Sequence, residues 1–172
     1  MKSPPPVARL LVVDDSKEIC QLIVNHYKLQ GYLIEMASCA ADAWKILVKD
    51  HFDIVISDII MPGMKGTELL QKIKRHYPMI HVIMITGYVS LEHLLSCMRG
   101  GADTCIFKPL DNFSELDSAI DEALASKHRW EDKIVALKGL KEMNPQSFEI
   151  LDDQSNEQTG EGIPVETVNV TE

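Results

Sequence analysis

Five polar residues stand where predicted strands end, and their side chains are of types that carry out phosphoryl chemistry. Asp14 and Asp15 follow a continuous apolar run, while Asp58, Thr86 and Lys108 end or follow three later runs. In an open parallel sheet, ligands bind outside the carboxyl ends of the strands. If the first and third strands are neighbours, about 4.8 Å apart, three carboxylates converge on one pocket.

Such a group of carboxylates needs a counterion. Two like charges about 4 Å apart repel by about 4 kcal/mol at an effective dielectric constant of 20. A divalent cation offsets this repulsion, and oxygen ligands with several waters suit Mg²⁺. A carboxylate beside such an ion can act as a nucleophile toward phosphorus. Lys108 then supplies a positive charge for the phosphoryl oxygens and Thr86 a hydroxyl donor.

The elements that position these residues alternate along the chain. Apolar runs indicate strands, and apolar residues at helical spacing indicate helices between them. We predict an α/β fold of the flavodoxin-like type, a doubly wound five-stranded parallel sheet in the order 2-1-3-4-5 with five helices. Asp15, with Glu18 three residues on, is expected to cap the first helix. The expected strands are 7–13, 32–37, 53–58, 80–86 and 104–107, and the expected later helices are 40–49, 67–76, 91–98 and from 113 onward.

Over residues 7–127 the sequence resembles the receiver domain of two-component response regulators, such as the chemotaxis receivers. The resemblance rests on four motifs that together are highly specific. They are Val-Val-Asp14-Asp15-Ser, the segment Asp58-Ile-Ile-Met-Pro-Gly-Met-Lys-Gly, Ile-Thr86-Gly and Phe-Lys108-Pro.

The resemblance implies a role for each motif residue. Asp58 would accept a phosphoryl group from a phosphohistidine on a sensor histidine kinase or a histidine phosphotransfer protein. Asp14, Asp15 and Asp58 would hold Mg²⁺, with Asp15 a direct ligand and the backbone carbonyl of Ile60 a further one. Thr86 and Lys108 would bind the new phosphoryl group. The chain would then be a signalling domain that supports only its own phosphorylation and dephosphorylation, and it would act on a downstream protein target.

The sequence departs from the family pattern at four positions. Cys105 stands where the family usually has a switch aromatic, three residues before the lysine, and Tyr88 is a candidate substitute for it. Gly87 replaces the usual alanine after the threonine. Ile60, two residues after Asp58, is apolar, and in such domains this side chain can influence the attacking water. Phosphate capture should survive these changes, whereas the output and the phosphate lifetime are left open.

The last predicted helix continues beyond the domain. Helical spacing extends through a helical extension, residues 128–143, and is followed by an acidic tail, residues 144–172, that is expected to be disordered. The tail contributes most of the net charge of -9. An apolar stripe on the extension is expected to form a homodimer or bind a partner, or else to fold back onto the domain. This stripe consists of Trp130, Ile134, Leu137 and Leu140.

Composition and charge argue against several classes of protein, namely nucleic-acid-binding, membrane-spanning and secreted proteins. The body of the chain is almost neutral and the tail is acidic, so we expect no direct nucleic-acid binding. No apolar run approaches the roughly 20 residues of a membrane span, and the first residues lack the apolar core of a signal peptide, so we expect a cytoplasmic protein. Only about 45 residues follow the receiver-like region, fewer than a DNA-binding domain of this family needs, so output through protein contacts is expected. The four cysteines, which we expect to be reduced core residues without a zinc site, are Cys20, Cys39, Cys97 and Cys105.

Two alternative functions are retained. One is a magnesium-dependent phosphatase with an aspartyl-phosphate intermediate, but such an enzyme needs an acid at the position of Ile60. The other is a phosphorylation-independent scaffold that keeps the fold. The complete set of motif residues argues against the scaffold, while Cys105 argues weakly for it.

Overall fold

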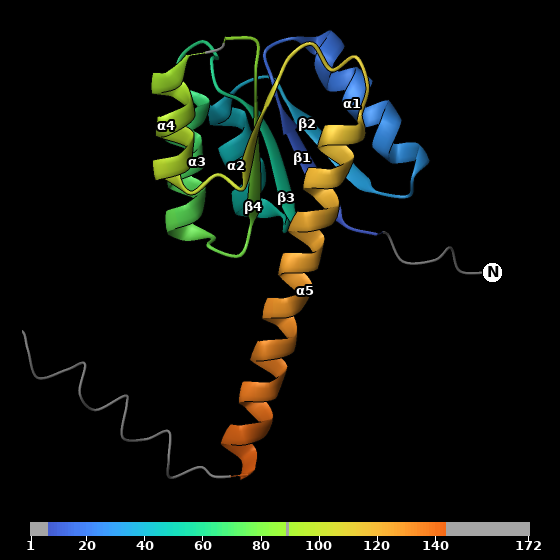
Figure 1. Ribbon diagram of the computed structural model, residues 1–172, viewed down its shortest axis with the longest axis vertical. Helices are drawn as coiled ribbons and strands as arrows, with labels where there is room; N and C mark the ends of the chain where they lie inside the picture. The colour runs from blue at the N-terminus through green and yellow to red at the C-terminus, as the bar shows by residue number, and fades with distance from the viewer. Residues whose placement is uncertain (1–6, 89, 144–172) are drawn as a thin grey trace, which may run out of the picture. The chain divides into compact units, whose positions relative to one another are not determined.

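The computed structural model describes residues 7–88 and 90–143. In this part of the chain five parallel strands form one sheet in the order β2-β1-β3-β4-β5, which confirms the predicted topology (Figure 1). In chain order the elements are β1 Arg9–Val13, α1 Lys17–Leu29, β2 Leu33–Ala37, α2 Ala40–Lys49, β3 Ile54–Asp58, α3 Gly66–His76, β4 His81–Thr86, α4 Leu91–Gly100, β5 Thr104–Phe107 and α5 Ser114–Met143.

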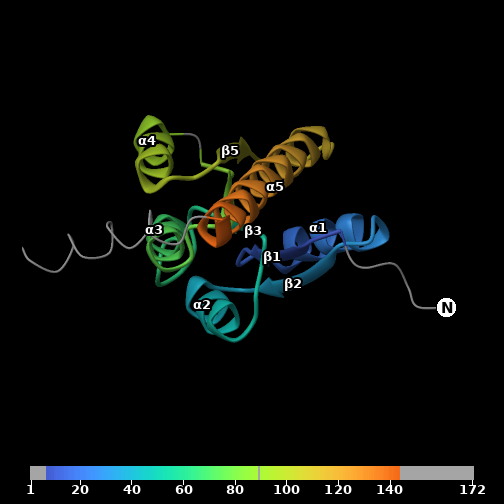
Figure 2. The same cartoon turned by 90° about the horizontal axis from the view of Figure 1, so that it is seen from below.

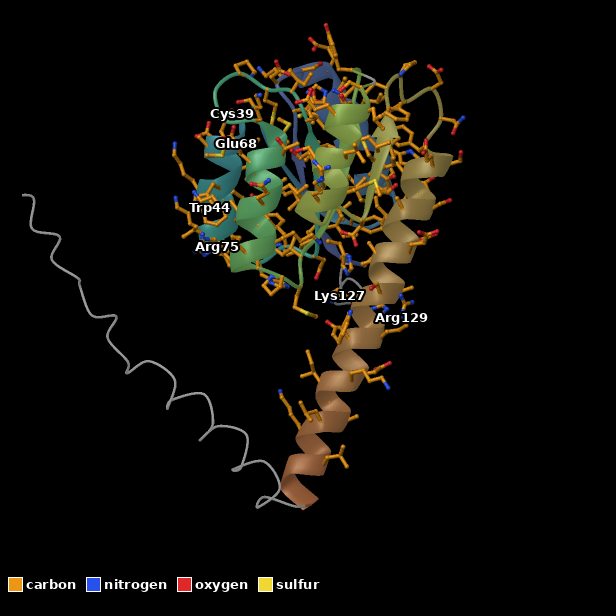
Figure 3. The ribbon with its side chains drawn as sticks, turned by 60° about the vertical axis from the view of Figure 1, so that its left-hand side comes forward. Cys39, Trp44, Glu68, Arg75, Lys127 and Arg129 are labelled. Carbon is orange, nitrogen blue, oxygen red and sulfur yellow. The ribbon has the colours of Figure 1, made fainter. Side chains whose placement is uncertain are left out.

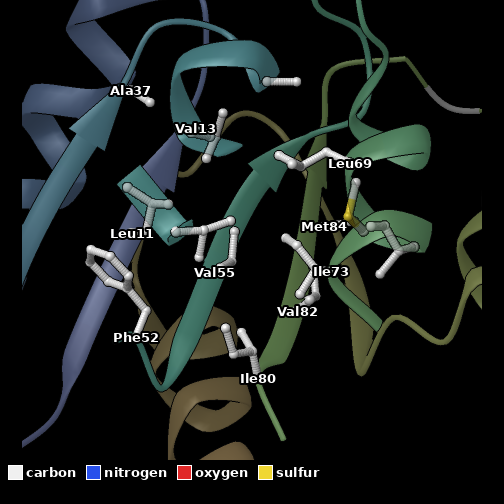
Figure 4. Close-up of a cluster of buried hydrophobic side chains, with 14 of the residues drawn as sticks. Leu11, Val13, Ala37, Phe52, Val55, Leu69, Ile73, Ile80, Val82 and Met84 are labelled. Carbon is white, nitrogen blue, oxygen red and sulfur yellow. The ribbon is translucent and has the colours of Figure 1, made fainter. Parts of the chain in front are cut away.

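Helices cover both faces of the sheet because the central strands are apolar on both sides. Successive side chains of a strand point to opposite faces, so Leu10 and Val12 of β1 face one helical layer, and Leu11 and Val13 face the other. Side chains of α1 and α5 pack in the first layer, and those of α2, α3 and α4 in the second (Figure 2). Figure 4 shows part of the second layer, in which Val55 and other strand residues meet helical side chains such as Leu69 and Ile73.

One predicted helix start was wrong by a residue. Ser16, not Asp15, is the N-cap of α1, and its hydroxyl accepts a hydrogen bond from the backbone N–H of Ile19. A hydroxyl on the last non-helical residue can reach the free amide groups of the first turn, and this leaves the exposed Asp15 for the rim of the sheet. Gly101 ends α4 in the left-handed conformation with φ 81°, which glycine adopts without steric cost.

Within the described residues the chain divides into two units, one up to His128 and one from Arg129 onward. The sheet and its helical layers belong to the first unit. In the second unit, the described part of α5 carries the predicted apolar stripe, whose side chains are all exposed: Trp130, Ile134, Leu137 and Leu140. Within the described residues, no helix is both long and apolar enough to cross a membrane. The predicted disorder of the acidic tail lies outside these residues.

Candidate functional site

Three carboxylates meet at the carboxyl ends of β1 and β3. The two strands are paired in parallel, with Val13 opposite Ser57, so that the residues after them emerge side by side. One oxygen of each of Asp14, Asp15 and Asp58 lies within 4.8 Å of the others. Asp14 and Asp58 are buried, whereas Asp15 is exposed. The sheet order therefore brings the acidic residues together as the sequence predicts.

Lys108, the residue after β5, links two of these carboxylates. The Lys108 ammonium lies 2.7 Å from Asp14 Oδ2 and 2.9 Å from Asp58 Oδ2. Its backbone N–H donates to the carbonyl of Thr86 at 2.8 Å, which fixes the end of β5 against β4. Burial disfavours the charged lysine, but the hydrogen bonds to Asp14 and Asp58 outweigh it and raise the pKa of Lys108 above its usual value. The ammonium therefore stays charged at neutral pH.

Asp14 still carries an electrostatic cost. Burial raises the pKa of its carboxyl above 3.8, although Lys108 and the backbone N–H of Ser16, which donates at 2.9 Å, oppose this. Three carboxylates against one ammonium leave a formal charge of -2 at the site. These donor atoms are all oxygens, the type that hard divalent cations prefer. The residues present therefore fit Mg²⁺.

Thr86 and Ile60 are the two remaining predicted site residues, and their hydrogen bonds are local. The Thr86 hydroxyl accepts a hydrogen bond from the backbone N–H of Tyr88 at 3.0 Å and donates to the Tyr88 carbonyl at 3.3 Å. The Ile60 N–H donates to Asp58 Oδ1 at 3.3 Å. Thr86 is thus held by its own loop and has no hydrogen bond to the carboxylates, while the Ile60 carbonyl as a metal ligand stays a prediction.

A glycine fixes the backbone of Asp58. Gly66, the first residue of α3, donates its N–H to the Ile59 carbonyl at 2.9 Å. A Cβ atom on Gly66 would lie 1.8 Å from the backbone oxygen of Asp58, far inside contact distance. The start of α3 can approach β3 this closely only without a side chain. The sequence contains Gly66 in the Asp58 motif but gives no sign of this contact, which depends on how the loop folds back.

Gly66→Ala should destabilise the domain and displace the Asp58 backbone. We expect a loss of about 1–3 kcal/mol of unfolding free energy from overpacking, together with slower phosphorylation, measured by urea denaturation and by mass spectrometry. Gly139→Ala is the control, since nothing lies within 4 Å of the added Cβ in the described residues. There, alanine should stabilise the helix by roughly 0.5–1 kcal/mol. Equal effects of the two substitutions would contradict the close approach.

Cys20 and Cys105 pack against the two hydrophobic clusters of the domain. Cys20 donates its thiol to the Asp14 carbonyl at 3.4 Å, and burial raises its pKa to about 11. Cys105, in place of the family's switch aromatic, is partly buried against the second helical layer, and burial raises the pKa of its thiol. Neither thiol is activated as a nucleophile. The contact of Cys20 with Asp14 is a feature that sequence reasoning missed, because a thiol carries no spacing signal for it.

Comparison with known proteins identifies the class. The profile of the response regulator receiver domain matches residues 10–121. The chain belongs to this family. Receiver domains are signalling domains that histidine kinases phosphorylate.

Particular relatives and structures agree with this assignment. The chain is 32% identical over 117 residues to the response regulator protein FleR of Pseudomonas aeruginosa, covering 68% of this chain and 25% of that one. A CheY-like receiver domain from Methanospirillum hungatei has a TM-score of 0.68 at 34% identity, covering 71% of this chain and 97% of that one. The response regulator TrrA of Thermotoga maritima, in complex with Mg²⁺ and beryllium fluoride, has a TM-score of 0.62 at 32% identity, covering 68% and 99%. The chain spans about a quarter of the length of FleR.

Proposed function

We propose that this receiver domain accepts a phosphoryl group on Asp58 from a histidine kinase or a histidine phosphotransfer protein, with Mg²⁺ bound beside it, and signals through protein contacts. The observation that carries this proposal is the Lys108 ammonium bridging Asp14 and Asp58, with an oxygen of Asp15 within 4.8 Å of both carboxylates. This arrangement supports the proposal, because the proposed nucleophile, a cationic side chain and two further carboxylates lie close together.

The reaction uses few groups. A carboxylate oxygen of Asp58 attacks the phosphorus of the donor and forms an acyl phosphate, while the bond from phosphorus to the donor's imidazole nitrogen breaks and its electron pair stays on that nitrogen. Lys108, already 2.9 Å from Asp58 Oδ2, holds a phosphoryl oxygen. The Thr86 hydroxyl exchanges its contact with Tyr88 for another phosphoryl oxygen. Positioning and charge neutralisation are the main needs of such a transfer.

Mg²⁺, when bound, neutralises charge on the transferring group. Asp14, Asp15, Asp58 and the Ile60 carbonyl would hold it. The raised pKa of Asp14 means that ionising this carboxyl opposes folding, since a group whose pKa is higher in the folded state favours that state only when protonated. A divalent cation therefore stabilises the folded protein at neutral pH.

Adding Mg²⁺ to metal-free protein should raise its unfolding free energy by about 1.4 kcal/mol when the ion is at ten times its dissociation constant. Thermal and urea unfolding with and without EDTA measure this. Asp15→Asn, a change at an exposed residue outside the Lys108 ion pairs, should weaken the Mg²⁺ effect, while metal-free stability should be equal or higher because one of three neighbouring like charges is removed. An equal response of both proteins to Mg²⁺ would argue against Asp15 as a ligand.

Acetyl phosphate tests the function without a kinase. The full chain incubated with Mg²⁺ and acetyl phosphate should gain one phosphoryl group by intact-mass measurement. Steady turnover of generic phosphate esters would instead favour the phosphatase, which the apolar Ile60 disfavours. No mass change under any of these conditions would favour the phosphorylation-independent scaffold.

The partners follow from the class of the protein. The sensor histidine kinase RcsC of Escherichia coli contains a region 36% identical to this chain over 101 residues, which is 59% of this chain and 11% of that protein. We therefore keep a histidine kinase or phosphotransfer protein as the donor and a protein as the target. The cytoplasmic location and the absence of nucleic-acid contacts stay predictions.

We also propose that the chain forms a homodimer through the exposed stripe of α5. Trp130, Ile134 and Leu137 follow the spacing of one helix face and expose 41–59% of their surface. The paired substitution Ile134→Asp with Leu137→Asp should convert a dimer into a monomer in sedimentation. Val135→Asp is the control, because Val135 is also exposed but lies on another side of the helix. An unchanged monomer before and after substitution would rule the dimer out.

A further inference from the structure

The exposed stripe of α5 has the spacing of a coiled-coil seam. Trp130, Ile134 and Leu137 follow one another after four and then three residues, which places all three on one narrow face of the helix. The proposed homodimer buries this face against the same face of a second copy. The apolar residues alone do not decide whether the two helices run parallel or antiparallel.

The two edges of this face differ in charge. One edge carries Glu131 and Lys138, which are seven residues apart and therefore lie on the same side of the seam. The other edge carries Lys133 and Leu140, which are also seven residues apart and are both exposed. The first edge thus has charges of both signs, whereas the second has a positive charge and an apolar side chain. When two helices pair, these edge residues meet across the seam and set the orientation.

A parallel pair would bring like charges together. In a parallel pair, a residue just before the seam meets the residue five positions later on the opposite edge of the other helix. Lys133 of each copy would therefore face Lys138 of the other, and the two-fold symmetry of a dimer would form this repulsive contact twice. Leu140 would face position 145, which lies beyond the end of α5 at Met143.

An antiparallel pair brings opposite charges together. When the helices run in opposite directions, each edge meets the same edge of the second copy. With Ile134 opposite Leu137 of the second copy, Glu131 faces Lys138 of the second copy, and the two-fold symmetry forms this pair twice. The edge charges therefore favour the antiparallel orientation.

The same register uses the whole helical extension, because it places position 128 opposite position 143 of the second copy. It also covers Leu140, which packs against the methylene groups of Lys133 of the second copy while that ammonium stays in water. The acidic tail contains seven Asp or Glu residues and no Lys or Arg. At a rise of about 1.5 Å per residue, the two tails then begin about 22 Å apart, which exceeds the Debye length of about 8 Å. A parallel pair would start both tails at the same end, where their charges repel.

We propose that two copies of this chain pair antiparallel through α5, with Ile134 against Leu137 and Glu131 against Lys138 of the second copy. This arrangement rests on the proposed homodimer and adds its orientation and register. The partner is a second copy because the charged edge, when reversed, is complementary to itself.

Charge reversal at Lys138 distinguishes the two orientations by the sign of its effect. In the full chain, Lys138→Glu should weaken the dimer about tenfold, because both contacts with Glu131 become repulsive. Glu131→Lys should weaken it by a similar factor. The double reversal should restore the dissociation constant to within about threefold of the wild-type value. Sedimentation equilibrium from about 1 µM to 1 mM chain covers the range of weak dimers.

Lys133→Glu is the matched control, because it makes the same charge change on the same helix. In the antiparallel pair it should change the dissociation constant less than about threefold, since the side chain of Lys133 faces Leu140. In a parallel pair it would strengthen the dimer, because it would face Lys138 with the opposite charge. Far-UV circular dichroism measures the helix content of each variant. Losses within one helix add in the double reversal and do not cancel, so recovered affinity reports a contact between copies.

The possible results separate this arrangement from the homodimer itself. A dimer that Lys138→Glu strengthens or leaves unchanged would overturn the antiparallel arrangement alone. A double reversal that dimerises more weakly than either single variant would also overturn it. A wild-type chain that stays monomeric up to about 1 mM would contradict the proposed homodimer and this arrangement with it. Phosphorylation of Asp58 is tested separately and does not depend on any of these results.

Discussion

Asp58→Asn should abolish phosphorylation by acetyl phosphate while the domain stays folded. Removing a nucleophile lowers a rate by about 10³-fold or more, and an amide oxygen cannot form the acyl phosphate. Asparagine has nearly the same shape, and Lys108 keeps its 2.7 Å contact with Asp14. Because the substitution also removes one of the like charges that raise the pKa of Asp14, metal-free stability should be equal or higher. Intact-mass measurement and urea denaturation give the two results.

The matched control for Asp58→Asn is Asp53→Asn. Asp53 directly precedes β3, whereas Asp58 is the last residue of that strand. Asp53 accepts the backbone N–H of Arg9 at 2.7 Å and pairs with Lys127, away from the candidate site. It should lower stability without lowering the phosphorylation rate of the folded protein. Phosphorylation of Asp58→Asn at the wild-type rate would show that another residue accepts the group.

Lys108→Ala should impair both stability and phosphorylation. Without the ammonium, buried Asp14 and Asp58 face each other uncompensated, and breaking such a pair costs about 3–5 kcal/mol, less what protonation of Asp14 recovers. The phosphorylation rate should fall about 10²-fold, since one preorganised charge on the phosphoryl group is lost. The loss of stability should be largest in EDTA and smaller in Mg²⁺, because the ion takes over part of the compensation.

Lys127→Ala controls for the loss of a lysine. Lys127 lies on α5 (Figure 3) and pairs with Asp53 at 3.3 Å, so it is also partly buried and ion-paired. Its removal should cost some stability but leave phosphorylation of the folded protein unchanged. If Lys108→Ala and Lys127→Ala phosphorylate equally fast, Lys108 has no special role at the site.

The fold was predictable because apolar periodicity fixes which side chains are buried. Leu10 to Val13 are all fully buried in β1, as expected for a strand covered on both faces. The edge strand β2 is harder to recognise, since Leu33 and Met36 are exposed there and the apolar run carries less information. The first helix cap was misplaced because Asp15 and Ser16 are both good caps, and only the local geometry chooses between them.

The sequence predicted which residues of the candidate site come together, but not the loop contacts that hold them in place. Residues at strand ends meet when the strand order is known, so Asp14, Asp58 and Lys108 are brought together as expected. The close approach of Gly66 to the Asp58 carbonyl and the hold of Tyr88 on Thr86 depend on loop conformations. Such contacts carry no periodicity in the sequence.

Locating the phosphoryl group tests the central claim most directly. The chain is phosphorylated with acetyl phosphate in Mg²⁺, reduced with borohydride, which converts an aspartyl phosphate into homoserine, and digested for peptide mass spectrometry. We expect homoserine at position 58 alone, and only when Mg²⁺ is present. Homoserine at another aspartate, or incorporation that is independent of Mg²⁺, would contradict a metal-supported phosphoacceptor at the carboxyl end of β3.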